Sequence, residues 1–380
     1  MIKIKNLLFF LLFFQLSAHA AVEKNWIDNQ VQKFIKDKPV KSVIYGLWIN
    51  DQPITINAMG DSMTGVPATT AMHFRIGGVT ETMLTTLLMK LSEEKILSLK
   101  DPVSQWFPHL PNAKNVNLNM LANCSSGFRD YVFVKEFNDY AVAHPFKQWA
   151  SSDLIKYAEV NNPVFDPDKN QQYSHTDFVV LGEILSKATH QSINTLFQNY
   201  IFKPLKMSNT EYNDLTASIS SPLLHAFSQD RNIYEDTTFW NPSSISSSGA
   251  VTSTITDLGI WGNAWMNSLL ISQDSTEQLR APTTVGKGKN TKNLYFAMGF
   301  AFANHWLIQT PRFGGYSGIF AVLPEKKMVF IAFNTLNESA QADDNANYSV
   351  ALWQNLAAQL APNYPAPILS KPKSSATAIH

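Results

Sequence analysis

Two pairs of short apolar runs, each pair separated by a polar turn sequence, lie one near each end of the chain and have the pattern of hairpins. Residues 43–49 and 54–56 are rich in β-branched and aromatic side chains and are separated by Asn-Asp-Gln-Pro, a turn sequence. Residues 319–323 and 328–333 repeat this pattern around Pro-Glu-Lys-Lys. The chain is therefore expected to begin and end its folded part with antiparallel strands.

Between the hairpins, apolar residues recur at helical spacing in three segments. The first segment follows Gly77-Gly78, the second follows Thr176, which we predict to be its N-cap, and the third lies near residue 355. The apolar stripes are Val79, Met83, Leu87, Leu88 and Leu91; Phe178, Leu181, Ile184 and Leu185; and Leu352, Leu356 and Leu360.

This order of elements predicts an α+β fold. An antiparallel sheet built from both chain ends, about residues 40–60 and 295–335, would carry flanking helices. A mainly helical subdomain would be inserted between the two halves of the sheet. A cleft between sheet and subdomain is the expected place for a site.

The two termini differ from the rest of the chain. Residues 1–20 have lysines near the start, then an apolar run, then Ala18-His19-Ala20, which is the pattern of a cleavable secretory signal. We predict cleavage near Ala20, no membrane span afterwards, and a secreted or periplasmic protein. The folded domain is expected over 21–361, and the Pro-, Ser- and Lys-rich stretch 362–380 is expected to be a flexible tail.

Composition narrows the class of partner. The chain has 380 residues, 30 basic and 30 acidic side chains, and a hydrophobic fraction of 45%, so it can bury a large core and has no basic excess for nucleic acid. Cys124 is its single cysteine, so no internal disulfide forms. A small molecule or a peptide is the expected partner.

Common catalytic signatures are missing from the sequence. It contains no paired histidines of the His-x-His or His-Glu-x-x-His type, no cysteine pair, no glycine-rich nucleotide loop and no Gly-x-Ser-x-Gly. We therefore predict neither a metal nor any other cofactor.

Seven segments, in order, resemble the serine β-lactamase and D-alanyl-D-alanine carboxypeptidase family, in particular its class C β-lactamase-like branch. The segments are residues 74–81, 97–103, 125–131, 173–182, 204–210, 248–254 and 315–318. The resemblance covers nearly all of the chain after the predicted signal. It implies the penicillin-recognising fold and an acyl-transfer site with three motifs.

The first motif of that family is Ser-x-x-Lys at the start of a helix, in which the serine attacks an acyl carbon and the lysine helps to remove its proton. This chain has Gly78 and Glu81 at those positions. Gly78 has no side chain to acylate. A carboxylate at Glu81 also disfavours a tyrosinate nearby, whereas an ammonium group would favour it.

The other two motifs are also altered. The family's Tyr-x-Asn corresponds to Tyr173-Ser174-His175, so an imidazole replaces the amide. Counting back from Gly315-Tyr316, the family's Lys-Thr-Gly corresponds to Gln309-Thr310-Pro311, in which only Thr310 matches. The resemblance implies that His175, Gln309, Thr310 and Tyr316 would contact a ligand, and that Tyr173 would be the retained catalytic hydroxyl.

Simpler structural roles remain open for these residues. Gly78 fits any helix start that needs a small residue, and Glu81 fits an acid that complements a helix dipole. Tyr173 and His175 fit buried packing or capping roles. The Ser-x-x-Lys match at residues 92–95 falls at the far end of its predicted helix, and Cys124 is interpreted as a small buried side chain.

The sequence thus predicts a secreted protein of this fold whose serine chemistry is disabled, a pseudoenzyme. It would bind a peptide, a peptidoglycan-derived fragment or another small molecule. The alternative is a hydrolase of another class, in which Tyr173, His175 and Glu81 activate water without an acyl-enzyme. A third hypothesis is a structural or partner-binding domain.

Overall fold

The computed structural model describes residues 24–160, 162–340 and 346–368. The predicted signal segment, residues 1–20, lies outside the described residues, as does most of the predicted tail. Within the described part of the chain, no helix is long and apolar enough to cross a membrane. The same part contains no group of three or more His, Cys, Asp or Glu residues arranged to hold a metal ion.

The main sheet joins both ends of the folded chain, as the hydrophobic pattern predicts. Its strand order is β3-β2-β1-β14-β13-β11-β10-β9, with β12 paired to β13. The strands are β1 (Val40–Ile49), β2 (Gln52–Met63), β3 (Val66–Pro67), β9 (Leu294–Phe296), β10 (Ala301–Ala303), β11 (Trp306–Gln309), β12 (Arg312–Phe313), β13 (Tyr316–Leu323) and β14 (Met328–Leu336). All pairings in this sheet are antiparallel, and β1 lies directly beside β14. The predicted α+β fold class is confirmed.

The first hairpin is tighter than the sequence suggests. Asn50 and Asp51 both have positive φ and form a two-residue turn, the type whose twist suits a β-hairpin. Pro53, which we assigned to the turn, lies inside β2 opposite Trp48. A proline is tolerated there because the outer edge of β2 is paired to β3 only near its far end, so no ladder hydrogen bond is lost at Pro53.

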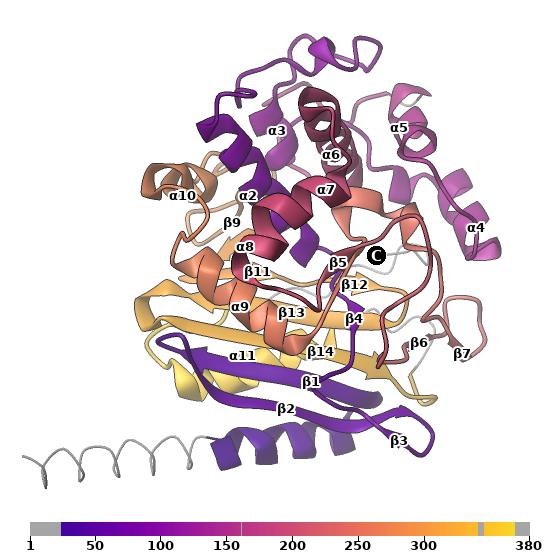
Figure 1. Cartoon of the computed structure of the whole chain (residues 1–380), viewed down its shortest axis with the longest axis vertical. Coiled ribbons are helices and arrows are strands. Elements are labelled where there is room, and N and C mark those ends of the chain that lie inside the picture. The colour runs from indigo at the N-terminus through magenta and orange to yellow at the C-terminus, as the bar shows by residue number, and fades with distance from the viewer. Residues whose placement is uncertain (1–23, 161, 341–345, 369–380) are drawn as a thin grey trace, which may run out of the picture.

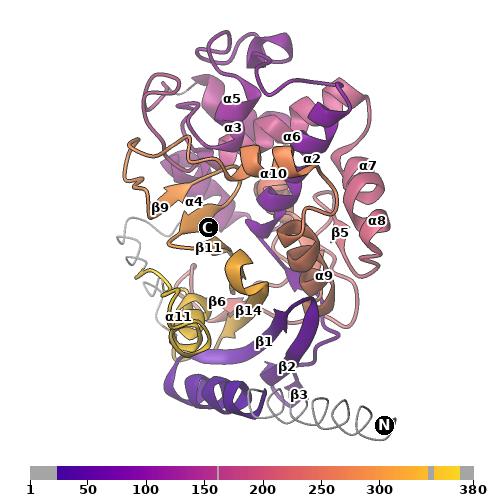
Figure 2. The same ribbon diagram turned by 90° about the vertical axis from the view of Figure 1, so that its left-hand side faces the viewer.

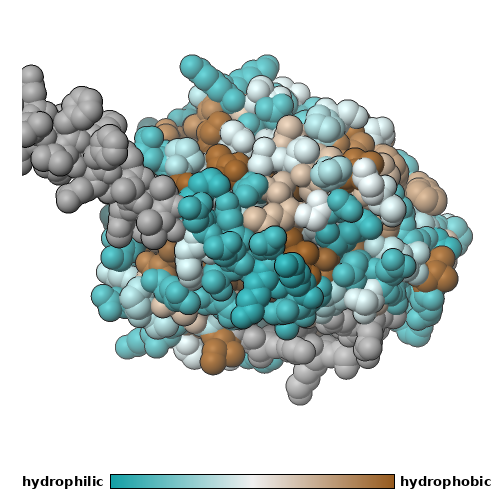
Figure 3. All heavy atoms as spheres, turned by 90° about the horizontal axis from the view of Figure 1, so that it is seen from below, coloured by the Kyte–Doolittle hydropathy of each residue, from teal (hydrophilic) through white to brown (hydrophobic). Residues whose placement is uncertain are grey.

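Side chains of β1 alternate between two buried layers, one on each face of the sheet. Ile44 and Trp48 face the core shared with the helical part, whereas Val43, Tyr45 and Leu47 face a second core. That second core is closed by α11 (Tyr348–Leu360) and by a helix over residues 24–37. Figure 2 shows α9 and α11 on opposite sides of the sheet. From below, the surface over helix 24–37 carries apolar side chains scattered among hydrophilic ones (Figure 3).

The helical part lies between the two halves of the sheet in the chain and above it in Figure 1. Its helices are α2 (Val79–Glu93), α3 (Leu118–Ala122), α4 (Lys135–Ala143), α5 (Ser151–Val160), α6 (His175–Thr189), α7 (Ile193–Phe197), α8 (Lys203–Leu205), α9 (Ile255–Met266) and α10 (Gln273–Arg280). Three short strands, β4 (Phe74–Arg75), β8 (Val251–Ser253) and β5 (Glu211–Tyr212), form a second sheet, and β6 (Phe227–Ser228) pairs with β7 (Glu235–Asp236).

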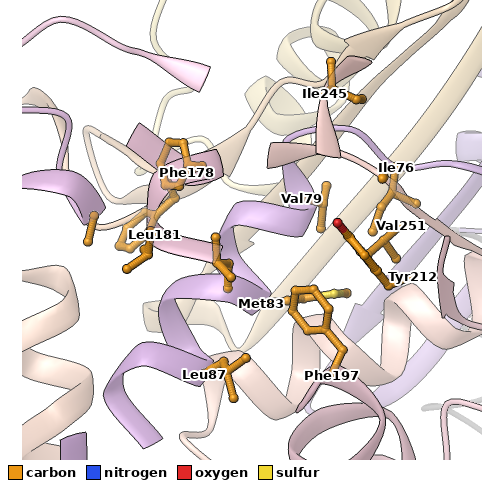
Figure 4. Close-up of a cluster of buried hydrophobic side chains, with 14 of the residues drawn as sticks. Ile76, Val79, Met83, Leu87, Phe178, Leu181, Phe197, Tyr212, Ile245 and Val251 are labelled. Atoms are coloured by element: carbon orange, nitrogen blue, oxygen red, sulfur yellow. The ribbon is translucent and has the colours of Figure 1, made fainter. Parts of the chain in front are cut away.

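The stripe of α2 packs where the predicted amphipathic pattern places it. Val79, Met83 and Leu87 are fully buried against neighbours that include Phe197 and Val251 (Figure 4). The helix is central rather than peripheral, because its other faces are buried as well. This fixes the position of its N-terminus, where the candidate site begins.

The predicted N-cap of the second helix is wrong by two residues. Ser174, with an extended backbone, is the N-cap of α6, and Thr176 lies inside the first turn. The Thr176 hydroxyl donates to the carbonyl of Arg129 and accepts from the backbone N–H of Tyr131. It therefore joins α6 to another loop instead of capping its own helix.

Candidate active site

Gly78 is the N-cap of α2, the position that the resemblance matches to the serine of the family's first motif. The preceding Gly77 has φ +49°, a left-handed conformation that suits glycine, and turns the chain from β4 into the helix. A Cβ on Gly77 would lie 2.9 Å from the Pro311 Cβ. Two glycines thus allow the segment after β11 to approach the helix end closely.

Glu81 lies one turn into α2 and is fully buried. The Tyr173 hydroxyl donates to its Oε1 atom in a short hydrogen bond, and the Gln309 side-chain amide donates to its Oε2 atom over 3.0 Å. Gln309 Nε2 also donates to the carbonyl of Gly299 over 2.7 Å. Both carboxyl oxygens of Glu81 therefore have partners, and the three side chains form a closed hydrogen-bonded cluster.

The Gln309 side chain lies against Gly78. A Cβ added to Gly78 would be 2.8 Å from Gln309 Oε1, closer than Cβ atoms approach other heavy atoms in proteins. The amide of Gln309 therefore occupies space that any side chain at position 78 would need. The substitutions at Gly78 and Gln309 fit one another sterically.

The electrostatics of this cluster differ from those of a lysine-activated site. Burial raises the pKa of Glu81 well above its ordinary value, and this outweighs the two hydrogen bonds that lower it. Burial, and then the adjoining Glu81, raises the pKa of Tyr173 well above its ordinary value. Tyr173 is thus held as a neutral phenol, in agreement with the effect predicted for a carboxyl group at position 81.

His175 forms a separate pair with Asp130. Its Nδ1 atom lies 2.9 Å from Asp130 Oδ2, and the other Asp130 oxygen accepts from the backbone N–H of Val132 over 3.1 Å. The Tyr173 and His175 rings meet edge to face, with centroids 4.9 Å apart. Asp130 was not predicted as a site residue, although it lies in one of the seven family-like segments, because no spacing rule joins it to His175.

One cavity of about 600 Å³ brings most of the predicted site residues together. Gly78, Tyr173, His175, Gln309 and Thr310 line it, and Glu81 lies beneath the wall, bonded to Tyr173 and Gln309. Its other lining residues come from the segments before α2 and β8, from the stretch β9 to β12, and from α11 and the two residues before it: Gly77, Ile245, Ser248, Gly249, Phe296, Ala301, Ile308, Pro311, Arg312, Ala346, Asn347, Val350, Ala351 and Gln354.

Tyr316 does not lie at the cavity. It begins β13, is 2% exposed, and donates its hydroxyl proton to the backbone carbonyl of Leu224. It is not among the residues that line the cavity. In this position the side chain joins β13 to the loop before β6. The ligand contact that the motif count predicted for Tyr316 would require this hydrogen bond to break.

Cys124 and Thr80, two other side chains that carry a possible nucleophilic atom, are buried. Burial, together with Asp177 and Glu81, raises the pKa of the Cys124 thiol well above its ordinary value, which disfavours the reactive thiolate. Thr80 is fully buried on α2 and does not line the cavity. The Ser-x-x-Lys match at 92–95 lies at the C-terminal end of α2, as predicted.

A model of one protein family matches most of the chain. The model of the β-lactamase family matches residues 27–354. The chain belongs to the β-lactamase family. Its fold is shared with the D-amino acid amidase from Ochrobactrum anthropi SV3 complexed with D-phenylalanine, at a TM-score of 0.75 and 17% identity over 87% of this chain and 97% of that one.

Curated relatives of this β-lactamase-family chain are distant. It is 22% identical over 187 residues to a β-lactamase of Psychrobacter immobilis, covering 48% of this chain and 44% of that protein. It is 26% identical over 154 residues to the teichoic acid D-alanine hydrolase of Staphylococcus aureus, covering 40% of this chain and 36% of that protein. The chain thus matches less than half the length of each.

Proposed function

We propose that this β-lactamase-family protein lacks serine acyl-transfer activity and binds a small molecule in the cavity at the end of α2. The observation that carries the proposal is the Gln309 amide packed against Gly78, where a nucleophilic side chain would stand. Acyl transfer needs a nucleophile and a group that removes its proton. Gly78 supplies neither an oxygen nor a sulfur atom.

The surroundings of Gly78 support the same conclusion. A buried carboxyl at Glu81 stands at the position of the ammonium group, and the neutral Tyr173 hydroxyl donates a hydrogen bond to that carboxyl. Pro311 has no backbone N–H, so it cannot donate a hydrogen bond to an acyl oxygen. The site therefore has no nucleophile at position 78, no ammonium group at position 81 and no backbone N–H donor at position 311.

The cavity is suited to a ligand with both apolar and amide or carbonyl groups. Ile245, Phe296, Ile308 and Val350 give it an apolar wall, while Thr310, Asn347 and Gln354 add hydroxyl and amide groups. Its volume lies in the range of small-molecule sites. D-amino-acid amides, peptides and peptidoglycan-derived fragments are the proposed ligand classes. One protein that shares the fold is named a D-amino acid amidase, and one distant sequence relative is named a teichoic acid D-alanine hydrolase.

The proposed location is the periplasm or the exterior of the cell. The support is the signal-like pattern of residues 1–20, which lie outside the described residues. Cell-wall fragments would be available to the protein there.

A cavity-filling variant tests the proposed ligand site. Ala351 on α11 lines the cavity, whereas Ala358, two turns along the same helix, is exposed to solvent. We expect D-amino-acid amides or muropeptides to raise the Tm of the wild-type protein and of Ala358→Trp, and to leave the Tm of Ala351→Trp unchanged. Thermal-shift titration measures this, and equal shifts in all three proteins would place the ligand elsewhere.

A further inference from the structure

His175 lines the cavity and pairs with Asp130 behind it, an arrangement that the proposed binding function does not use. Asp130 Oδ2 holds His175 Nδ1 at 2.9 Å, and the His175 side chain is 10% exposed while lining the cavity. Among the described residues none makes a hydrogen bond to His175 Nε2. The ring is thus fixed by one nitrogen and offers the other to whatever occupies the cavity.

Asp130 is itself held in place. Its second oxygen accepts from the backbone N–H of Val132 and caps the short helical turn at 131–133. A carboxylate that accepts from Nδ1–H places the imidazole proton on Nδ1 and leaves a lone pair on Nε2. In this tautomer, His175 is able to take a proton from water in the cavity.

We propose that Asp130 and His175 activate water for the hydrolysis of small esters with apolar acyl groups, with His175 as the catalytic base and Asp130 as its positioning residue. This inference rests on the proposed use of the cavity as a ligand site, and it needs no enzyme nucleophile. Glu81 is not the base: both its oxygens accept hydrogen bonds, and it does not line the cavity.

The reaction balances without any further reagent. His175 Nε2 takes one proton from water as the water oxygen bonds to the acyl carbon, and the carbonyl π pair moves to the carbonyl oxygen. When the tetrahedral intermediate collapses, the bond from carbon to the alcohol oxygen breaks, and the imidazolium returns its proton to that oxygen. The products are an alcohol and a carboxylic acid, which ionises in solvent.

The lining of the cavity favours esters over amides and apolar acyl groups over charged ones. An alcohol oxygen leaves more readily than an amide nitrogen, which must be protonated as its bond breaks, and in the proposed reaction His175 serves both proton transfers. Ile245, Phe296 and Ile308 offer an apolar surface to the acyl chain, and the exposed hydroxyl of Thr310 is a donor for the ester carbonyl.

Hydrolysis of p-nitrophenyl butyrate by the purified protein tests the inference. We expect saturable turnover without an initial burst, and a kcat about 100-fold lower in His175→Asn with little change in KM. His109→Asn is the matched control, because His109 is exposed in a loop and lies outside the cavity. We expect this control to keep the wild-type kcat.

Asp130→Asn separates positioning from folding. Asparagine keeps an oxygen for the Val132 N–H, but its amide donates to His175 Nδ1, which moves the ring proton to Nε2 and removes the base. We expect kcat to fall on the order of 10- to 100-fold with KM unchanged. Added imidazole should partly restore the activity of a His175→Ala protein above the rate that imidazole gives without protein, whereas a His175→Ala,Asp130→Ala protein should show only that background rate.

Three results would overturn the inference: no saturable turnover by the wild-type protein, equal kcat in His175→Asn and His109→Asn, or no effect of Asp130→Asn. None of these touches the proposed ligand site, which stands or falls by the Ala351→Trp titration. A burst with a covalent acyl adduct would instead contradict both the proposed function and this inference.

Discussion

Replacement of Gly127 by alanine is expected to lower the free energy of unfolding by about 4 kcal/mol. Gly127 has φ +84°, and a Cβ there would lie 2.1 Å from the backbone carbonyl oxygen of Phe165. The carbonyl of Gly127 also accepts from the backbone N–H of Val164. Two backbone segments thus meet at this glycine, three residues before Asp130, and neither segment can yield as a flexible side chain could.

Gly286 provides a matched control. Its φ is +85°, nearly the same as that of Gly127, but a Cβ there meets no atom within 4 Å. Gly286→Ala should therefore cost about 1 kcal/mol, the strain of the left-handed backbone alone. Urea denaturation of both variants measures the difference, and equal losses would mean that residues 127 and 165 are not in close contact.

The second large effect is a pH-dependent stabilisation by Glu81→Gln. The pKa of Glu81 is raised by burial, so the folded protein keeps a proton that the unfolded chain releases above its ordinary carboxyl pKa of about 4.3. The stability that protonated Glu81 contributes is complete below that pH and is lost as the pH rises toward the raised pKa. Over this window the wild-type protein loses about 1.4 kcal/mol per pH unit from this group.

Glutamine has a similar shape and does not titrate, so Glu81→Gln should become more stable relative to the wild type as the pH increases from about 4.3. Asp177, whose pKa is also raised by burial, is present in both proteins and cancels in the difference. Glu136→Gln, at an exposed position on α4, is the control and should show the wild-type pH dependence. A difference between Glu81→Gln and the wild type that does not vary with pH would mean that Glu81 is ionised in the folded protein.

Much of the fold could be predicted because it depends on local pattern. The apolar run of β1 follows from burial on both faces of a strand, and the apolar residues of α2 recur at helical spacing, although the other faces of that helix are buried as well. The pairing of β1 with β14 joins residues almost 300 positions apart, as in Ile44 and Phe333, and it was expected only because both ends carried strands. The start of α6 was misplaced because Thr176 bonds to a distant loop rather than to its own helix.

The candidate site was predicted in part. The order of the motifs predicted that Gly78, Glu81, Tyr173 and Gln309 belong to the site. The sequence could not show that the Gln309 amide packs against Gly78, because this contact depends on where β11 ends in space. The pair of Asp130 and His175 joins a loop to a helix start 45 residues later, and no periodic pattern connects them. Tyr316 was predicted from the motif count to contact a ligand, but its hydroxyl donates a hydrogen bond to the Leu224 carbonyl instead.

The most direct test of the central claim is the mass of the intact protein after exposure to acylating probes. The purified protein is incubated with a labelled penicillin and, separately, with a fluorophosphonate, and an active serine β-lactamase is treated alongside to show that the probes react. We expect an unchanged mass for this protein, because Gly78 offers no nucleophile and Gln309 fills the space above it. A stable adduct on any serine or threonine of the chain would contradict it.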